Sequence, residues 1–259
     1  MDLQLGGRTV VVRGGSSSVG LATVETLLGE GANVVTCGRD AERLRQLHVA
    51  GVVPARLVTR VAHVTDPAQS IGVVDSAVQA FGRLDALLAN AGEGSTRSVI
   101  HSPYDDWTRQ FDTKVGSVLH VVRAAIPDLI ASDAGRVVVV AVTSHAPDPA
   151  MPAVSAARAA VASASELLAR ELAPHGVCVY VVSLGPIRTD RQRARFEQSG
   201  TLLDYDEWCR QQAAERGVPL GRFGAPEEVA PWVAALVSPL ASYVTGATLD
   251  LAGGLGARP

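Results

Sequence analysis

Lysine is nearly absent from this sequence. Of 23 basic residues, 22 are arginine, and Lys114 is the only lysine among 259 residues. Genomes rich in G and C favour the codons of arginine, alanine, valine and glycine, so we expect a high-GC bacterium as the source. That bias accounts for most of the arginines. A single lysine that is present despite the bias is a candidate functional residue.

Cysteine is also scarce. The three cysteines, Cys37, Cys178 and Cys209, are odd in number, scattered, and never spaced as C-x-x-C. This pattern excludes a disulfide framework and is typical of reduced thiols in a cytosol. It also argues against zinc, so we expect no metal site and a cytoplasmic protein.

An excess of positive charge and a long apolar run are both missing. With 26 acidic and 23 basic residues, the formal charge is −3 and the isoelectric point is near 6.1. Proteins that bind nucleic acid or anionic membranes carry basic surfaces, so we expect neither partner. No apolar run approaches the ~20 residues that span a bilayer, and Asp2 and Arg8 interrupt what would be the apolar core of a signal peptide.

Apolar, β-branched runs alternate with longer helix-like stretches, and 47% of the residues are hydrophobic. This alternation indicates parallel strands buried on both faces and joined by right-handed helical crossovers. With no repeat, low-complexity tract or linker, we predict one α/β domain over residues 1–259, built on a doubly wound parallel sheet. The predicted strands are Thr9–Arg13, Asn33–Cys37, Arg56–Val61, Asp85–Ala89, Val137–Val142, Val177–Ser183 and Thr248–Leu251.

Helix starts are marked at two places. Asp66-Pro67 has the form of an N-cap followed by proline at the first helical position, and Ala225–Glu228 places acidic residues in a first turn. The stretch 188–221 breaks the alternation, is rich in Arg and Gln, and contains Tyr205 and Trp208. An excursion of this length inside a domain is typically disordered or a functional lid, and we favour the lid.

A glycine-rich turn follows the first predicted strand. Residues 13–20 read Arg-Gly-Gly-Ser-Ser-Ser-Val-Gly and open the first helix. Such a turn lets backbone N–H groups and the helix N-terminus meet a pyrophosphate. Taken alone, the turn is equally consistent with a tight strand-to-helix connection.

Several segments together resemble the short-chain dehydrogenase/reductase family. They are residues 14–20, 135–140, 171–177, 185–189, 220–224, 243–246 and 253–254. The resemblance implies a Rossmann-like fold, a helical substrate lid at about 188–221, and a nicotinamide dinucleotide site. By alignment, the cofactor-binding positions are Gly14, Ser16, Ser17, Ser18, Val19, Gly20, Arg39, Asn90, Ala91, Gly92, Arg158, Ile187 and Thr189.

The residues at these positions suit NADP better than NAD, but imperfectly. An acidic residue at Gly38 would bind the 2′-hydroxyl of NAD, whereas Arg39 suits the 2′-phosphate of NADP; Arg39 is equally consistent with a solvated arginine at a strand end. Arg13, Ser18, His63 and Ala89 depart from the family pattern. We therefore expect NADP(H) to bind weakly, or no dinucleotide at all.

The family's catalytic residues align with side chains that cannot replace them directly. The serine falls on Ala141 or Val142, the tyrosine on Val154, the lysine on Arg158, and the relay asparagine on Lys114. Valine has no proton to give, and arginine stays charged because its pKa exceeds ~12.

The candidate substitutes are Lys114, Arg158, Ser144 and His145. Beside a cationic arginine in an enclosed cleft, Lys114 is a candidate base or nucleophile. The competing interpretation is a lysine whose stem fills the space of the missing relay and whose ammonium pairs with a carboxylate.

Three hypotheses remain open. The first, narrowly favoured, is a non-catalytic subunit, a pseudoenzyme that associates with itself or with an active relative. The second is a non-redox acid/base catalyst of the dehydratase, cyclase or isomerase type, acting on a hydrophobic oxygenated metabolite under the lid. The third is an atypical NADPH-dependent reductase, since proton donation supplies only ~10² to 10⁴ of a rate enhancement.

Assembly follows from two predicted helices, Thr113–Ser132 and Pro152–Pro174. On the second, residues 154, 157, 161, 165 and 168 form one stripe toward the sheet, and residues 156, 160, 164 and 167 form a small-residue stripe on the other side. In the resembling family such helices make the dimer interface. We therefore expect a dimer or tetramer, of this chain alone or with an active relative.

Overall fold

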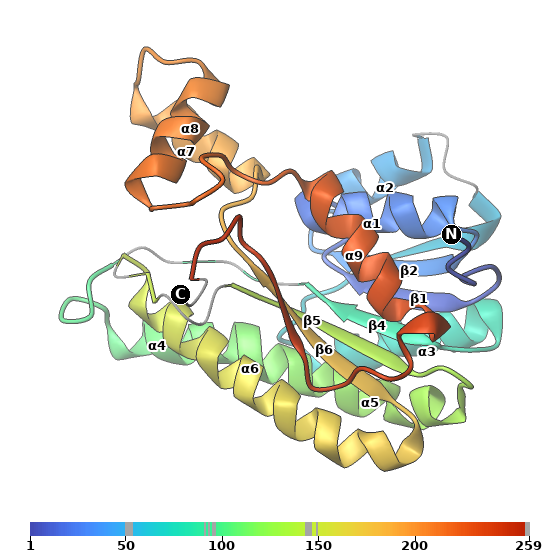
Figure 1. Ribbon diagram of the computed structural model, residues 1–259. Helices are drawn as coiled ribbons and strands as arrows, with labels where there is room; N and C mark the ends of the chain where they lie inside the picture. The colour runs from blue at the N-terminus through green and yellow to red at the C-terminus, as the bar shows by residue number, and fades with distance from the viewer. Residues whose placement is uncertain are drawn as a thin grey trace.

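The computed structural model describes residues 1–49, 54–90, 92, 94, 97–142, 147–148 and 150–256. Within it, seven parallel strands form one sheet in the order β3-β2-β1-β4-β5-β6-β7 (Figure 1). The strands are β1 (Thr9–Arg13), β2 (Asn33–Gly38), β3 (Leu57–Val61), β4 (Ala86–Ala89), β5 (Arg136–Val142), β6 (Cys178–Leu184) and β7 (Thr248–Leu251). The order reverses between β1 and β4, so the predicted doubly wound sheet is confirmed.

Helices cover both faces of the sheet. On one face lie α1 (Ser18–Gly29), α2 (Ala41–Val49) and α9 (Pro226–Val237); on the other lie α3 (Pro67–Phe81), α4 (Tyr104–Phe111), α5 (Ser117–Ala131) and α6 (Pro152–Leu172). Successive strand residues alternate between the two layers. Val10 and Val12 join the core beneath α1 and α9, whereas Val11 joins the core beneath α3 and α5. This burial on both faces explains why the central strands β1, β4, β5 and β6 are largely apolar, whereas the edge strands β3 and β7 also carry polar residues.

The boundaries differ from the predicted ones by small amounts with local causes. β1 and β7 have the predicted limits, but β3 begins one residue late because Pro54–Arg56 form a 3₁₀ turn. The N-cap is confirmed, since the Asp66 side chain accepts from the N–H groups of Ala68 and Gln69. At the start of α9, Glu228 accepts from the N–H of Ala225 at 2.8 Å.

The helix predicted at Thr113–Ser132 is part of a longer rod. α4 continues through a single π turn (Asp112–Gly116) directly into α5. π turns interrupt α-helices mostly at functional sites, because the extra residue redirects the side chains around it. The turn carries Lys114.

The segment 188–221 is helical. α7 (Asp190–Ser199) and α8 (Tyr205–Glu215) stand away from the sheet at the top of Figure 1. They share a small apolar cluster in which Phe196, Tyr205, Trp208 and Phe223 pack ring against ring. Residues 188–221 therefore have a small apolar core of their own, and α7 and α8 pack against each other around it.

α6 has the two predicted faces. Val154, Ala157, Val161 and Ser165 are buried toward the sheet. The stripe of Ala156, Ala160 and Ala164 is half-buried, and Leu167 beyond it is 61% exposed. Assembly through this face stays a prediction.

The three cysteines are buried and free, separated in β2, β6 and α8. Within the described ranges, no helix has the length and apolar character needed to cross a membrane.

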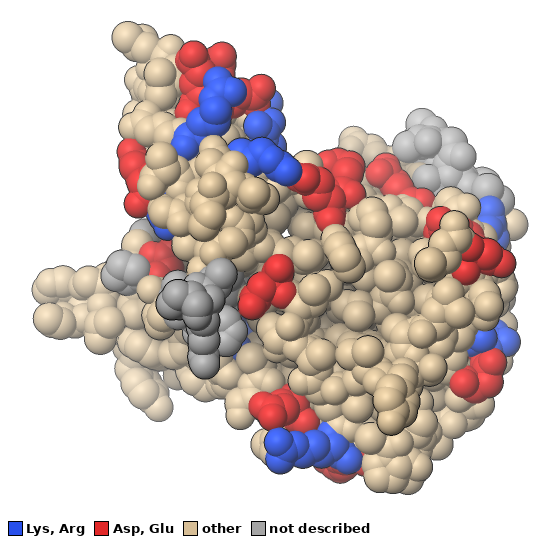
Figure 2. All heavy atoms as spheres, viewed as in Figure 1, with Lys and Arg blue, Asp and Glu red and all other residues tan. Residues whose placement is uncertain are grey.

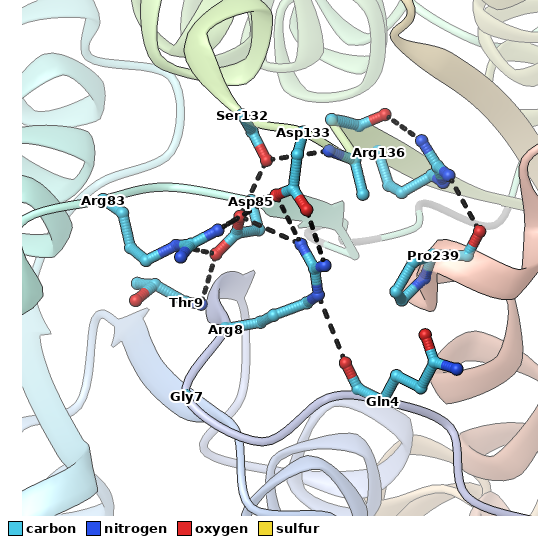
Figure 3. A network of polar contacts seen from close by, with 12 residues as sticks. Gln4, Gly7, Arg8, Thr9, Arg83, Asp85, Ser132, Asp133, Arg136 and Pro239 are labelled. Carbon is cyan, nitrogen blue, oxygen red and sulfur yellow. Dashed lines mark hydrogen bonds and ion pairs between the residues drawn. The ribbon is translucent and has the colours of Figure 1, made fainter.

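At the amino ends of the strands, one buried carboxylate joins three neighbouring strands. Asp85, fully buried just before β4, accepts from the backbone N–H of Thr9 in β1 at 2.8 Å and from the hydroxyl of Ser132 at 2.7 Å (Figure 3). Arg83 grips it with two hydrogen bonds, and Arg8 lies 3.4 Å away. Its backbone carbonyl also accepts from Arg136, the first residue of β5.

These donors decide the ionisation of Asp85. Burial alone would raise the pKa of its carboxyl, but the hydrogen bonds from Arg83, Thr9 and Ser132 outweigh burial and hold the pKa below its usual range. The ionised carboxylate is therefore the form that the fold stabilises.

We predict that Asp85→Asn lowers the free energy of unfolding at pH 7 by about 3 kcal/mol or more, because arginine and backbone donors lose a buried charged acceptor. The native pKa lies below the unfolded value of about 3.9. The stabilisation is thus present above pH 4 and is lost as pH falls through the native pKa, so the variant should lose less stability than the wild type between pH 5 and pH 2. Urea unfolding followed by circular dichroism measures both effects.

The matched control is Asp75→Asn, which removes an exposed carboxylate on α3 and should change stability by less than about 0.5 kcal/mol. Equal losses in the two variants would contradict the role given to Asp85.

Candidate active site

A cavity of about 1370 Å³ opens at the carboxyl ends of the central strands. Its wall includes Gly14 after β1, Asn90 after β4, Ala141 near the end of β5 and Gly185 after β6. From there it continues beneath α7 and α8. The crevice at the switch of strand order is where open α/β sheets bind ligands, and this one exceeds the ~300–1,000 Å³ of an ordinary small-molecule pocket.

The glycine-rich turn forms one end of the cavity. Gly14 has a φ of +74°, in the left-handed region, and a Cβ at Gly20 would lie 2.0 Å from the carbonyl oxygen of Gly14. The turn is therefore possible only with glycine at position 20. Residues Gly14, Ser16, Ser17, Ser18 and Val19 line the cavity, whereas Gly20 does not. Gly20 permits close packing behind the turn, and its role as a cofactor-binding position stays a prediction.

Ser18 is held in a conformation that side chains disfavour. Its φ is +47° at the first position of α1, and its hydroxyl lies 3.2 Å from a carboxylate oxygen of Asp190. The same hydroxyl accepts from the N–H of Asp190 at 3.1 Å. Ser18 thus ties the phosphate turn to the start of α7, and this pair offsets part of the backbone strain.

Cationic side chains gather beyond β2. Arg39 and Arg43 both line the cavity, and Arg43 pairs with Asp190 at 2.8 Å. His63, after β3, also faces the cavity. Arg39 therefore lines the cavity, as its predicted contact with the 2′-phosphate of NADP requires.

Arg13 does not enter the cavity. Its side chain is 1% exposed, and its guanidinium donates to the carbonyls of Ser117 at 2.5 Å and Val64 at 2.9 Å. Burial, partly opposed by neighbouring Cys37, lowers the pKa of Arg13 to about 10. Its place in the sequence suggested a flaw in the nucleotide site, but its side chain instead joins β1 to the start of α5.

Lys114 lines the cavity from the π turn. It is 5% exposed, and its Nζ donates to Gln110 Oε1 at 2.8 Å. A Cβ at Gly92, which also lines the cavity, would lie 3.7 Å from this Nζ. The lysine predicted as a candidate catalyst therefore projects beside the loop after β4.

Arg158 lines the same cavity from α6. Burial lowers the pKa of its guanidinium to about 10, the charge of Arg191 adds to this effect, and Asp148 opposes it. Val154, one turn earlier on α6, is 1% exposed and lies outside the cavity wall. Lys114 and Arg158 thus line one cavity, while Val154, predicted to occupy the family's tyrosine position, packs into the core.

The remaining predicted positions divide in two. Asn90, Gly92, Ile187 and Thr189 line the cavity. Ala91, Ser144 and His145 lie outside the described residues, as does the side chain of Val142.

An arginine group beside α7 and α8 was not predicted from the sequence. Arg191 and Arg195 of α7, and Arg216 just after α8, line the cavity with Asp148 and Glu215. The signal was available, because Arg191 and Arg195 are four residues apart and so share one helix face. Which way that face points is set by the docking of α7 and α8, which a single sequence does not reveal.

Comparison with known proteins agrees with this geometry. The family model described as enoyl-(acyl carrier protein) reductase matches residues 14–256. The 3-oxoacyl-[acyl-carrier-protein] reductase of Salmonella typhimurium is 31% identical over 96% of this chain and 97% of its own.

Two solved structures are informative. A short-chain oxidoreductase of Pseudomonas aeruginosa PAO1, described as containing an atypical catalytic center, is 37% identical with a TM-score of 0.92 over 98% of this chain and 99% of its own; it has also been solved with NADPH. L-Sorbose reductase of Gluconobacter frateurii, solved with NADPH and L-sorbose, is 27% identical with a TM-score of 0.92 over 100% of both chains.

The residues matched by the family model include the phosphate turn, the Lys114 turn and α6. This chain belongs to the short-chain dehydrogenase/reductase family.

Proposed function

We propose that this protein is an NADPH-dependent oxidoreductase that reduces a carbonyl substrate without the family's tyrosine. One observation carries the proposal: a single cavity joins the phosphate turn, Arg39 and Lys114. The Pseudomonas relative, solved with NADPH and described as having an atypical catalytic center, supports it.

The residues present fit a dinucleotide. The close approach of Gly20 to Gly14 leaves the backbone of the turn open toward the cavity, at the N-terminus of α1, where phosphate oxygens are favoured. Gln192, on the cavity wall beside Thr189, has a buried Oε1 without a hydrogen-bond partner among the described residues. A ligand donor such as a carboxamide would satisfy it.

Within this site, NADPH would supply the hydride that adds to the carbonyl carbon. Arg158 offers five N–H donors to ribose hydroxyls, although it cannot shuttle a proton. The Lys114 ammonium, oriented by Gln110, would stabilise negative charge on the substrate oxygen and donate the proton that completes the alcohol.

A titration of the purified protein with NADPH and NADH tests this proposal. We expect NADPH to bind more tightly than NADH, with micromolar or weaker affinity because Ser18 and His63 depart from the family pattern. Submicromolar affinity for NADH would contradict both the preference and the weakness, and absence of NADPH binding would remove the proposal.

A second candidate function is the non-catalytic subunit. Complete burial of Val154 favours it, because this side chain does not line the cavity and carries no proton to transfer. The half-buried alanine stripe and exposed Leu167 of α6 supply a surface for a partner of the same fold. A monomer by light scattering, with no partner recovered from the native host, would exclude this candidate.

We predict that Arg39→Gln weakens NADPH binding about tenfold and leaves NADH binding within about twofold, because only NADPH carries the phosphate that a guanidinium grips. Fluorescence titration measures both affinities. Arg45→Gln, an exposed change on α2 outside the cavity, is the control and should alter neither. A parallel loss for both dinucleotides would show that Arg39 does not read the 2′-phosphate.

We predict that Ser18→Gly tightens NADPH binding several-fold. Glycine adopts a positive φ without strain and removes the Cβ from the side where the backbone approaches the phosphates. Relief of the backbone strain raises the melting temperature and loss of the Ser18–Asp190 hydrogen bonds lowers it, so the melting temperature should change little. Ser17→Gly, at the extended N-cap position, lacks the strain and should bind no better than wild type. Weaker binding in Ser18→Gly would indicate that the link to α7 outweighs the strain.

We predict that Lys114→Ala lowers kcat by about 10² to 10⁴ with a ketone substrate, the range expected for loss of a general acid, while NADPH affinity changes less than about twofold. Lys114→Arg keeps the charge but not a transferable proton, so it restores activity only if the role is electrostatic. Steady-state kinetics and circular dichroism of both variants separate chemistry from folding. Full activity in Lys114→Ala would show that the proton comes from elsewhere.

A further inference from the structure

The end of the cavity beneath the lid has an excess of positive charge. Four arginines line it, from α6, α7 and the end of α8, against two carboxylates. These residues are Arg158, Arg191, Arg195 and Arg216, with Asp148 and Glu215. On the outer surface of the α7–α8 unit, basic and acidic side chains lie side by side (Figure 2).

Two of the four arginines, Arg158 and Arg216, have no carboxylate partner within hydrogen-bonding distance among the described residues. Arg43, Arg83, Arg188 and Arg222 each pair with a carboxylate at 2.6–2.8 Å. Arg158 and Arg216 are nevertheless both partly buried. Burying guanidinium groups without a counter-ion costs free energy that an anionic ligand would recover.

The charges of these arginines influence one another. Burial lowers the pKa of Arg216, and the charge of Arg195 adds to this effect, whereas Asp148 and Glu215 oppose it. Likewise, burial and the charge of Arg191 lower the pKa of Arg158, whereas the charge of Asp148 raises it. The charge of Asp148 thus acts on both Arg158 and Arg216, and the arginines of the group still outnumber its carboxylates.

This group is not the phosphate site of the dinucleotide. The phosphate turn at residues 14–19, with Arg39 and Arg43, forms the other end of the cavity. Lys114 and apolar side chains, among them Met151, Leu184 and Trp208, line the same cavity, and the guanidinium of Arg195 lies 3.9 Å from the sulfur of Met151. A substrate whose carbonyl is at Lys114 would therefore present its far end to the lid arginines.

We propose that the substrate is an oxo compound with an apolar body and a terminal oxyanion, a carboxylate or a phosphate, which Arg195 and Arg216 bind beneath the lid. This inference rests on the proposed function for the carbonyl, but the anion site itself does not require bound cofactor. Binding of anionic probes to the cofactor-free protein therefore tests it separately from the NADPH titration.

The probes are 4-acetylbenzoate, its methyl ester and 4-acetylphenyl phosphate, which share an aromatic ketone and differ in the remote group. Calorimetry should show at least one anionic probe binding tenfold or more tightly than the ester, and the identity of that probe tells carboxylate from phosphate. Arg216→Gln should weaken the anionic probe about tenfold or more and leave the ester unchanged, as expected for loss of a charge-assisted hydrogen bond.

The matched control is Arg210→Gln, an exposed arginine on α8 outside the cavity wall, which should leave every affinity unchanged. Arg39→Gln should likewise leave the probes unaffected, since an anion lodged at the dinucleotide end would respond to it. Equal binding of ester and anions, no binding of either anion at millimolar concentration, or equal effects of Arg216→Gln and Arg210→Gln would overturn the proposal. If the anionic probes bind as expected but NADPH does not bind, the reductase proposal is rejected and the anion-site proposal is retained.

Discussion

The buried carboxylate of Asp85 is the interaction on which the position of the site depends. Its side chain fixes the first residue of β1, and its backbone carbonyl fixes the first residue of β5. β1, β4 and β5 are therefore held in register at their amino ends. Strands aligned at one edge have a defined offset at the other, where the phosphate turn, Asn90 and Ala141 line the cavity.

The two edges of the sheet use charge differently. At the amino edge, Arg8 and Arg83 share two carboxylates, Asp85 and Asp133, and the group is closed on itself. At the carboxyl edge the arginines outnumber the carboxylates. An ion-pair network with balanced charges stabilises the fold. An excess of arginines in a cavity lowers stability until an anionic ligand balances the charge.

The sequence predicted the sheet and much of the dinucleotide end, because both depend on local patterns. The apolar runs set β1 and β7 correctly, and the glycine-rich turn placed Gly14 and Ser16 on the cavity wall. Side chains whose direction depends on packing were not predictable. Arg13 turned away from the site, and the arginines of α7 and α8 became part of it only through the aromatic cluster that docks the two helices.

Two departures from the family pattern, far apart in the sequence, are physically linked. Arg13 donates to the carbonyl of Ser117, whose hydroxyl donates to the carbonyl of Thr113 inside the π turn. A π turn disrupts the regular hydrogen bonds of a helix, and donors from outside compensate for the loss. The long side chain at position 13 thus buttresses the turn from which Lys114 enters the cavity. A shorter residue at position 13 would remove this link between β1 and the helix that carries Lys114.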